Sequence, residues 1–245
     1  MRMVPQAFGV NLFSRAFLKW VGCYLRYLRQ KNYSFEDVDS LLEDHFTRWS
    51  DRNHPSRAGF AKALSLIEAP YTILETGTSA WGCDSTRLFD ALVREFGGFF
   101  ISVDIRSEAS KWLSFQKSQR TRLINLDSVV FIENELKKFG LESIDFCYLD
   151  SFDIDFSQPL QSAKHHLAEF RGLEPFLRVG SIVMIDDQPF EIEEIPQEFH
   201  QVSSKILDEY GFLPGKATLI LNEISNRRDI EIVWKNQSVI LQFKN

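Results

Sequence analysis

The sequence predicts an α/β fold: a doubly wound, Rossmann-like sheet of seven mainly parallel strands that ends in an antiparallel C-terminal hairpin. From residue 71 onward, short runs rich in β-branched residues alternate with longer stretches of helical periodicity, as in repeated strand-helix-strand units. Glycines such as Gly140 and Gly180 stand where these stretches change, which is typical of turns. The chain of 245 residues is long enough for one well-buried core, so we expect one such domain behind a helical N-terminal extension.

The N-terminal helical extension is predicted over residues 1–56, and the α/β domain over residues 57–245. Apolar residues at spacings of three and four within residues 8–28 predict one face of a helix. Charged residues such as Arg15, Lys19 and Arg26 interrupt this stretch, which argues against a signal peptide and against a membrane span. We therefore expect the helix to pack on its own domain or to form the contact of a homodimer.

The elements of the α/β domain are predicted in chain order. Strands are expected at residues 72–75, 99–103, 129–132, 144–149 and 181–185. Helices are expected between them at residues 85–96, 108–120, 134–139 and 161–177, and after them at residues 197–210 and 216–224. Residues 217–221 suit a strand as well. The chain closes with strands at residues 230–235 and 238–243, and Asn236 and Gln237 between them are short enough for a hairpin turn.

The balance of charge bears on the class of partner. Acidic residues number 34 and basic residues 28, which gives a formal net charge of −6. This charge disfavours a protein whose affinity comes from neutralising phosphates, so nucleic acid is not expected as a partner. The three cysteines, Cys23, Cys83 and Cys147, are widely spaced and odd in number. They indicate neither a disulfide framework nor a zinc site, and they favour a cytoplasmic protein.

The loop after the first predicted strand has the composition of a ligand-binding turn. Glu75 ends the strand, and Gly77 and Gly82 lie in the loop, where the absence of a Cβ lets the backbone approach a ligand closely. The glycine spacing is not that of a dinucleotide-binding loop. An acid at this position would repel a pyrophosphate, and it suits a ligand with a positive charge, such as the α-ammonium of a methionine moiety.

Carboxyl groups also end later strands. Asp104, which follows the second strand, can accept hydrogen bonds from both hydroxyls of a ribose, although dinucleotide-binding folds use an acid at the same place. Asp150 ends the fourth strand, and Asp186 and Asp187 end the fifth. Three carboxylates on adjacent strand ends are costly to hold together unless a cation lies among them. A divalent metal with oxygen ligands, Mg²⁺, Mn²⁺ or Ca²⁺, would suit them.

The segment Glu-Thr-Gly-Thr-Ser-Ala-Trp-Gly at residues 75–82 resembles motif I of the class I S-adenosylmethionine-dependent methyltransferases. With the acids at the later strand ends, the resemblance covers about residues 71–189. It extends to the metal-dependent small-molecule O-methyltransferases, both the catechol type and the macrolide or aminocoumarin sugar type.

This resemblance implies a set of site residues at the carboxyl ends of the strands. S-adenosylmethionine would be bound by Glu75, Gly77, Thr78, Ser79, Ser85, Asp104, Asn134 and Asp150. Mg²⁺, or Mn²⁺ or Ca²⁺ in its place, would be bound by Asp150, Asp186 and Asp187. For Asn134, whose alignment to the adenine-contacting position is loose, a plain helix cap is an equal alternative.

Two positions bear on the type of methyltransferase and on the general base. The catechol-type enzymes place a lysine base three residues after the first metal acid, where this chain has Asp153. They also carry an asparagine in place of the second acid of the pair, whereas Asp187 keeps the charge, as in the sugar-methylating enzymes. The base is therefore expected at Asp150 or at His166. Only one of the adjacent His165 and His166 can face the site from a helix.

Together these features predict an enzyme that methylates a hydroxyl group of a small molecule, such as a sugar, a diol or a natural product, with S-adenosylmethionine and Mg²⁺. The three carboxylates favour an enzyme, because an inactive relative need not keep a costly cluster of charge. Two alternatives stay open: a non-catalytic cofactor-binding or assembly protein with the same fold, and an N-methyltransferase. The N-terminal helices would act as a substrate lid or as the contact of a homodimer.

Overall fold

The computed structural model describes residues 34–79 and 83–245 of the chain. The chain divides into two compact units, residues 1–35 and residues 36–245, and every described helix and strand lies in the larger unit. The helix predicted within residues 8–28 lies outside the described residues. No helix of the described part has the length and apolar character needed to cross a bilayer.

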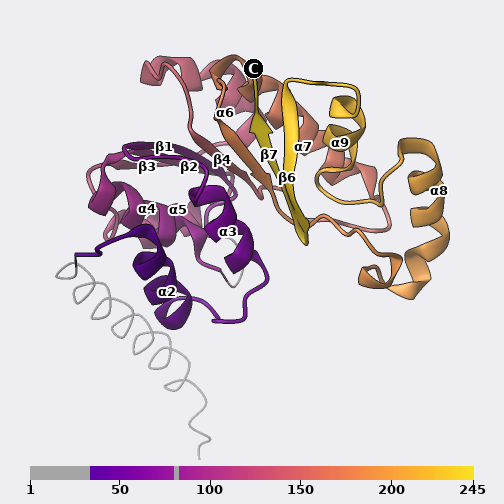
Figure 1. The fold of residues 1–245 in the computed structure, drawn as a ribbon, viewed down its shortest axis with the longest axis horizontal. Coiled ribbons are helices and arrows are strands. Elements are labelled where there is room, and N and C mark those ends of the chain that lie inside the picture. Colours follow the sequence, from indigo (N-terminus) through magenta and orange to yellow (C-terminus); the bar gives the residue numbers. More distant parts are fainter. Residues whose placement is uncertain (1–33, 80–82) are drawn as a thin grey trace, which may run out of the picture. The chain divides into compact units, whose positions relative to one another are not determined.

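The larger unit is built on a seven-stranded sheet with the strand order β3-β2-β1-β4-β5-β7-β6 (Figure 1). The strands are β1 Tyr71–Thr76, β2 Gly98–Asp104, β3 Thr121–Asn125, β4 Phe146–Leu149, β5 Ile182–Ile185, β6 Ile230–Asn236 and β7 Ser238–Phe243. The first five are parallel, and β7 pairs antiparallel with both β5 and β6. The predicted α/β class, with its parallel sheet and closing hairpin, is confirmed.

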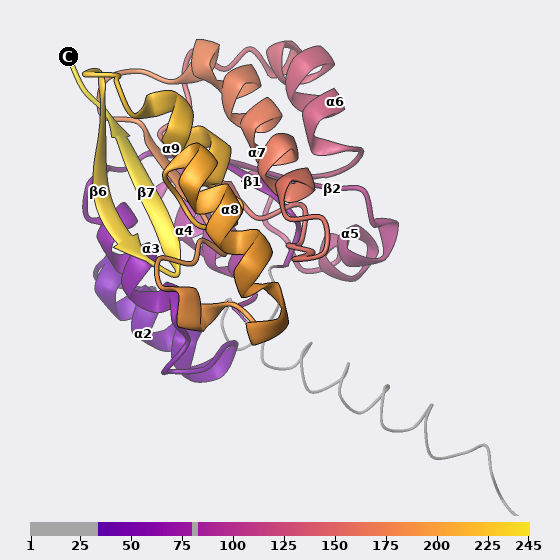
Figure 2. The same ribbon diagram turned by 90° about the vertical axis from the view of Figure 1, so that its right-hand side faces the viewer.

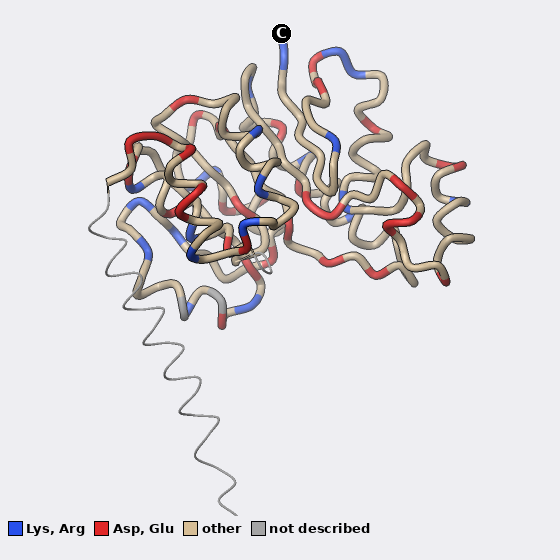
Figure 3. The backbone as a smooth tube through the Cα atoms, turned by 60° about the horizontal axis from the view of Figure 1, so that its bottom comes forward, with Lys and Arg blue, Asp and Glu red and all other residues tan. Residues whose placement is uncertain are grey.

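Helices cover both faces of this sheet (Figure 2). They are α2 Val38–Arg48, α3 Ser56–Leu64, α4 Ser85–Phe96, α5 Ser107–Ser114, α6 Ser128–Asn134, α7 Leu160–Leu173, α8 His200–Tyr210 and α9 Thr218–Ile224. Short 3-10 turns occur at Leu136–Phe139, Glu174–Phe176, Ile192–Glu194 and Gln197–Phe199. Helices α3, α4 and α5 pack on one face, and α6, α7 and α9 share a core with the other. Lys and Arg are interspersed with Asp and Glu along the unit (Figure 3).

The two faces explain why the central strands are apolar throughout. Leu74 of β1 and Val183 of β5 belong to the core that α6, α7 and α9 cover. Ile73 and Phe146, on the alternate positions, are also buried, on the face of α3 and α4. Parallel strands that are covered on both sides lose the alternation of apolar and polar residues. This is the pattern from which the strands were predicted.

The third strand was predicted wrongly. Residues 129–132 lie in helix α6, and the strand is β3, Thr121–Asn125, which pairs with β2. A short apolar run such as Val-Val-Phe-Ile fits either element by periodicity alone. The Asp127 carboxylate decides the outcome locally, because it accepts a hydrogen bond of 3.0 Å from the backbone N–H of Val130 and so caps the helix. The strand itself is half-exposed and less apolar, so its signal is weak.

Other elements agree with the sequence to within a few residues. Helix α5 ends at Ser114, earlier than the predicted residue 120, and the predicted helix at residues 134–139 is mostly the 3-10 turn Leu136–Phe139. Residues 217–221, which also suited a strand, begin helix α9. Helix α2 and all of α3 belong to the larger unit, so residues 36–56 of the predicted extension are part of it.

Aromatic side chains fill the core between the sheet and helices α3 and α4. Phe89 of α4 lies at their centre, with its ring centroid 5.6 Å from that of Phe60, 5.5 Å from those of Phe100 and Phe146, and 5.9 Å from that of Tyr148. All five side chains are fully buried, and the rings of Phe89 and its neighbours meet edge to face. This cluster ties helix α4 to β2 and β4.

Replacing Phe89 by alanine would open a cavity at the centre of this cluster. We expect Phe89→Ala to lower the free energy of unfolding, measured by urea denaturation, by about 3–5 kcal/mol. Phe115→Ala is the matched control, because the Phe115 side chain is 84% exposed. The control should change stability by no more than about 0.5 kcal/mol. Equal losses in the two variants would contradict this description of the core.

Candidate functional site

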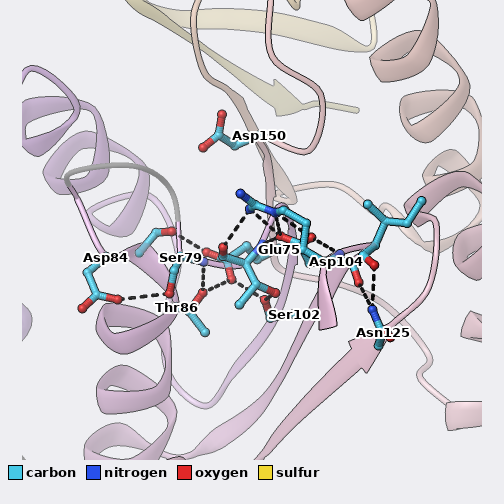
Figure 4. A network of polar contacts seen from close by, with 12 residues as sticks. Glu75, Ser79, Asp84, Thr86, Ser102, Asp104, Asn125 and Asp150 are labelled. Atoms are coloured by element: carbon cyan, nitrogen blue, oxygen red, sulfur yellow. Dashed lines mark hydrogen bonds and ion pairs between the residues drawn. The ribbon is translucent and has the colours of Figure 1, made fainter. Parts of the chain in front are cut away.

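The carboxyl ends of β1, β2, β4 and β5 bring acidic residues to one edge of the sheet. In chain order they are Glu75, Asp104, Asp150, Asp186 and Asp187, all of which the sequence singled out. Strand order reverses between β1 and β4, and ligands of open α/β sheets bind at such a switch point. Figure 4 shows part of the polar network at this edge.

Glu75 is enclosed by hydroxyl groups. Its Oε1 accepts a hydrogen bond of 2.5 Å from Ser85 Oγ, and its Oε2 accepts bonds of 2.5 Å from Thr86 Oγ1 and from Ser102 Oγ (Figure 4). The side chain has no exposed surface, and burial raises the pKa of Glu75 to about 8 although the three donors oppose the rise. Glu75 and Ser85 therefore fasten the start of helix α4 to the ends of β1 and β2.

Gly77 lies where the loop after β1 crosses the end of β4. Its φ is +87°, and a Cβ placed on it would lie 2.3 Å from the backbone oxygen of Asp150. Only glycine fits this position, because any side chain would collide with backbone. The sequence argument assigned the close approach to a ligand, whereas the structure shows that the backbone of β4 requires it.

Thr78 and Ser79 connect this loop to β2 and α4. The N–H of Thr78 donates to Asp104 Oδ2 at 2.9 Å, and Thr78 Oγ1 lies 2.7 Å from Ser102 Oγ. The N–H of Ser79 donates to Thr86 Oγ1 at 2.6 Å. The predicted loop residues thus belong to one continuous network (Figure 4).

Asp104 ends β2 beside a cavity. Its carboxylate accepts the N–H of Thr78, the N–H of Arg106 at 2.6 Å and Arg106 Nη2 at 2.6 Å. The Asp104 side chain is nearly buried, whereas that of Arg106 is 64% exposed. The cavity has a volume of about 170 Å³, and it is lined by Gly77, Val103, Asp104, Ile105, Asp127, Ser128, Ser151, Phe152 and His165.

Asn134 is not among the residues that line this cavity. It stands at the last position of α6, where its Nδ2 donates to the backbone oxygen of Val130 at 3.0 Å. Asp127 and Ser128, at the beginning of the same helix, line the cavity instead. The misplaced third strand shifted the predicted loop by about two helical turns, from residues 126–128 to residues 133–134.

His166, predicted as one candidate base, is directed into the protein interior. Its side chain is fully buried, its Nδ1 donates to the backbone oxygen of Ser162 at 2.9 Å, and burial lowers its pKa to about 4. His165 is the member of the pair that lines the cavity, with its Nε2 2.9 Å from Ser128 Oγ. The same nitrogen lies 3.3 Å from Glu169 Oε1.

Glu169 is a site residue that the sequence reasoning missed. It is fully buried on α7, accepts a hydrogen bond of 2.7 Å from Ser151 Oγ, and lies within ion-pair distance of His165. Burial would raise the pKa of Glu169, but the two adjacent histidines outweigh it and hold the pKa at about 2. Glu169 therefore fixes two walls of the cavity, the residue after Asp150 and the ring of His165.

Lys216, also missed, lies among the predicted metal ligands. Its Nζ hydrogen-bonds to Asp150 Oδ1 and forms an ion pair of 2.8 Å with Asp187 Oδ2, and its side chain has no exposed surface. Burial works to lower the pKa of Lys216, but the two carboxylates outweigh it and raise the pKa above its ordinary value. The side chain is therefore an ammonium. In the sequence around Lys216, the only feature that could have drawn attention to it is the Pro214-Gly215 turn before a helix.

The third predicted metal ligand, Asp186, has partners of its own. Its Oδ2 accepts a hydrogen bond of 2.5 Å from the Tyr148 hydroxyl and one of 3.5 Å from Ser56 Oγ. Within residues 34–79 and 83–245, no group of three or more His, Cys, Asp or Glu side chains has an arrangement that could hold a metal ion. As they are placed here, the three aspartates fit an internal ammonium and a tyrosine hydroxyl better than a divalent ion.

A larger cavity opens beside Asp187. Its volume is about 440 Å³, and its lining consists of Asp153, Ile154, Phe156, Asp187, Gln188, Pro189, Glu194 and Gln237. None of these lining residues is Lys or Arg. Asp187 is more than half exposed, so its carboxylate joins this cavity to Lys216.

Comparisons with known proteins place the fold. No protein-family model matches the chain, and no curated protein sequence matches it significantly. Among solved structures, the MycE methyltransferase in complex with Mg, SAH and mycinamycin VI matches with a TM-score of 0.59 and 16% identity, over 99% of this chain and 68% of that one. MycE in complex with Mg and SAH matches with a TM-score of 0.53 and 16% identity, over 100% of this chain and 68% of that one. CalS11, a calicheamicin methyltransferase, matches with a TM-score of 0.52 and 12% identity, over 99% of this chain and 100% of that one. The chain therefore has the Rossmann-like fold of these methyltransferases.

The dependence of the free energy of unfolding on pH tests whether His166 is buried and neutral. Below its ordinary pKa of 6.5 the unfolded chain takes up a proton that the folded chain excludes down to about pH 4. Stability is therefore lost as pH falls through this interval, by about 2–3 kcal/mol from this histidine. We expect urea denaturation at pH 7 and at pH 4.5 to show a smaller loss for His166→Asn than for the wild type.

The matched control is His200→Gln, which alters a half-buried histidine on α8. It should keep the pH dependence of the wild type. If His166→Asn and the wild type lose the same free energy between the two pH values, His166 is not the buried neutral group described here.

Proposed function

We propose that the chain is an S-adenosylmethionine-dependent methyltransferase that acts on a small molecule. The observation that carries this proposal is the cavity at the switch point, where Asp104 ends β2 and the glycine loop crosses the end of β4. Asp104 and Gly77 of the glycine loop both line this cavity, an arrangement that suits a nucleoside with a charged tail. The fold shared with MycE and CalS11 supports the same reading.

The nucleoside half of the cofactor would lie in the smaller cavity. Asp104 would accept the ribose hydroxyls once Arg106, which is largely exposed, releases its carboxylate. Ile105 and Phe152 are 70% and 40% exposed, and both line this space, so they offer apolar faces to an adenine ring. Ser128 and His165 add polar groups at its rim.

The methionine half would lie toward the ends of β1 and β4. S-adenosylmethionine carries a sulfonium and an α-ammonium, and a site with a negative potential binds such a ligand better than it binds a pyrophosphate. Burial is the main cause of the raised pKa of Glu75, and the charge of Asp150 adds a smaller repulsion to it. A cationic ligand at this place would relieve that repulsion.

The acceptor would occupy the larger cavity beside Asp187. Its size suits a small molecule, and its lining combines apolar side chains with three acids, Asp153, Asp187 and Glu194. Acids in the lining disfavour phosphorylated acceptors and favour neutral or cationic ones. A hydroxyl of a sugar, a diol or a natural product fits this description, and Asp150, which Lys216 joins to Asp187 of the lining, is the candidate to accept its proton.

Magnesium is not part of this proposal. Two of the three aspartates that the sequence assigned to it already bond to Lys216, and the third bonds to Tyr148. The chemistry asked of the protein is chiefly alignment, since the attacking atom, the methyl carbon and the sulfur must be nearly collinear. The two cavities, one lined by Ser151 and Phe152 and the other by Asp153, would provide that alignment.

An N-methyltransferase is the second candidate. The acidic lining of the larger cavity also suits an amine, which would bind as a cation and be methylated after losing a proton. A screen that pairs hydroxylated acceptors with their amino analogues distinguishes the two functions.

Calorimetric titration with S-adenosylmethionine tests the proposal. We expect micromolar binding by the wild type and an affinity at least about tenfold lower for Asp104→Ala, because two hydrogen bonds to a charged acceptor are lost. Glu108→Ala, which alters an exposed acid on the neighbouring helix α5, should bind as the wild type does. NAD⁺, which shares the ribose and adds a pyrophosphate, should not bind.

Absence of S-adenosylmethionine binding by the wild type would refute the cofactor assignment. Unchanged affinity in a folded Asp104→Ala protein would refute the placement of the ribose.

A further inference from the structure

The position of Lys216 is defined by acids from two strands. Its ammonium bonds Asp150, at the end of β4, and Asp187, which follows β5 and pairs at 2.8 Å. The lysine side chain is completely buried, and Asp187 is exposed on its outer side. An unpaired charge at this depth would be strongly unfavourable, and the two carboxylates compensate it.

The backbone on either side of Lys216 is fixed by a buried glutamine. Gln188 Nε2 donates to the oxygen of Leu213 at 3.0 Å, and its Oε1 accepts the N–H of Ala217 at 3.0 Å. A Cβ on Gly215 would lie 2.4 Å from that same Oε1, so the turn is closed tightly around the amide.

Further bonds complete this turn. Thr218 Oγ1 accepts the N–H of Gly215 at 2.7 Å and donates to the oxygen of Leu213 at 2.7 Å. The N–H of Lys216 itself donates to the backbone oxygen of Asp187 at 3.2 Å. These bonds hold the backbone that carries Lys216 in place beside the two aspartates.

A divalent ion would have to compete with this lysine. Mg²⁺ requires six oxygen ligands at about 2.0–2.1 Å in nearly ideal geometry, which two aspartates joined through an ammonium do not offer. Displacing Lys216 from the aspartates would leave its positive charge buried without a partner, which is strongly unfavourable. Asp186, the remaining ligand, already accepts a hydrogen bond from the Tyr148 hydroxyl.

We infer that Lys216 is the resident cation of this acidic edge, in the role that a divalent metal has in the metal-dependent methyltransferases, and that the site of Asp150, Asp186 and Asp187 binds no divalent ion. The placement of the charge rests on these contacts alone. Its consequence for catalysis, a methyl transfer that needs no metal, rests on the proposed function. Lys216 is then a positioning residue, which acts through Asp150 and Asp187.

Manganese titration of the full chain, followed by the loss of the electron paramagnetic resonance signal of free Mn²⁺, tests this inference. The wild type should bind no Mn²⁺ in the micromolar to millimolar range, and its thermal unfolding should not respond to Mg²⁺. Lys216→Met removes the charge and keeps the length of the side chain. It should bind one Mn²⁺ ion, regain thermal stability with Mg²⁺, and lose the ion when Asp187→Asn is added.

Lys205→Met, an exposed lysine on α8, is the matched control and should behave as the wild type does. Lys216→Arg, which keeps the charge, should bind no Mn²⁺ either. Submillimolar Mn²⁺ binding by the wild type that Asp186→Asn abolishes would overturn the inference. So would a folded Lys216→Met protein that gains no metal site. If Lys216→Met does not fold, the wild-type and Lys216→Arg titrations decide.

The outcome is independent of the cofactor. Failure to bind S-adenosylmethionine would refute the proposed function and leave the manganese result intact. Where an acceptor is found, the rate of methyl transfer should be the same in EDTA as in Mg²⁺, and a rate that EDTA abolishes would contradict the metal-free role of Lys216.

Discussion

The sheet topology imposes one constraint on the rest of the larger unit: parallel strands deliver their carboxyl ends, and with them five carboxyl groups, to the same edge. Each acid costs free energy to bury unless a donor or a cation meets it. The partners differ from acid to acid: hydroxyls for Glu75, backbone N–H groups and Arg106 for Asp104, Lys216 for Asp150 and Asp187, and Tyr148 for Asp186.

The end of β4 is where these loops meet. Gly77 approaches it so closely that no side chain fits, and the residues that follow Asp150 divide the two cavities between them. Ser151 and Phe152 line the smaller cavity, and Asp153 lines the larger one. Asp150 itself directly precedes the residues that line the two cavities.

The strands and their terminal acids were predictable because their signal is local. A buried run followed directly by an acid, as at Asp104 and Asp150, can be recognised without knowledge of the rest of the chain. The third strand had no such signal, since β3 lies at the sheet edge and is half-exposed, while the apolar run of α6 resembles a strand. For the same reason the loop that follows this strand was predicted at Asn134, whereas it precedes α6.

The partners of the acids could not be predicted, because they come from distant parts of the chain. Lys216 lies 66 residues after Asp150, and Ser102 lies 27 residues after Glu75. Which of His165 and His166 faces the cavity depends on how α7 is rotated against the sheet, and the pattern of the helix leaves that rotation open. The pattern of acids at adjacent strand ends did indicate that the three aspartates require a cation. It could not indicate that the cation is part of the chain.

A lysine in this role has consequences that differ from those of a metal. A divalent ion can bind one or two acceptor oxygens directly and lower the pKa of a bound hydroxyl. Lys216 has no exposed surface, so it cannot contact an acceptor, and its influence passes through the carboxylates that it holds. The cavity wall must then orient the acceptor, and a carboxylate such as Asp150 must accept its proton. With a lysine in place of a metal, both tasks would therefore fall to the shape and the acids of the larger cavity.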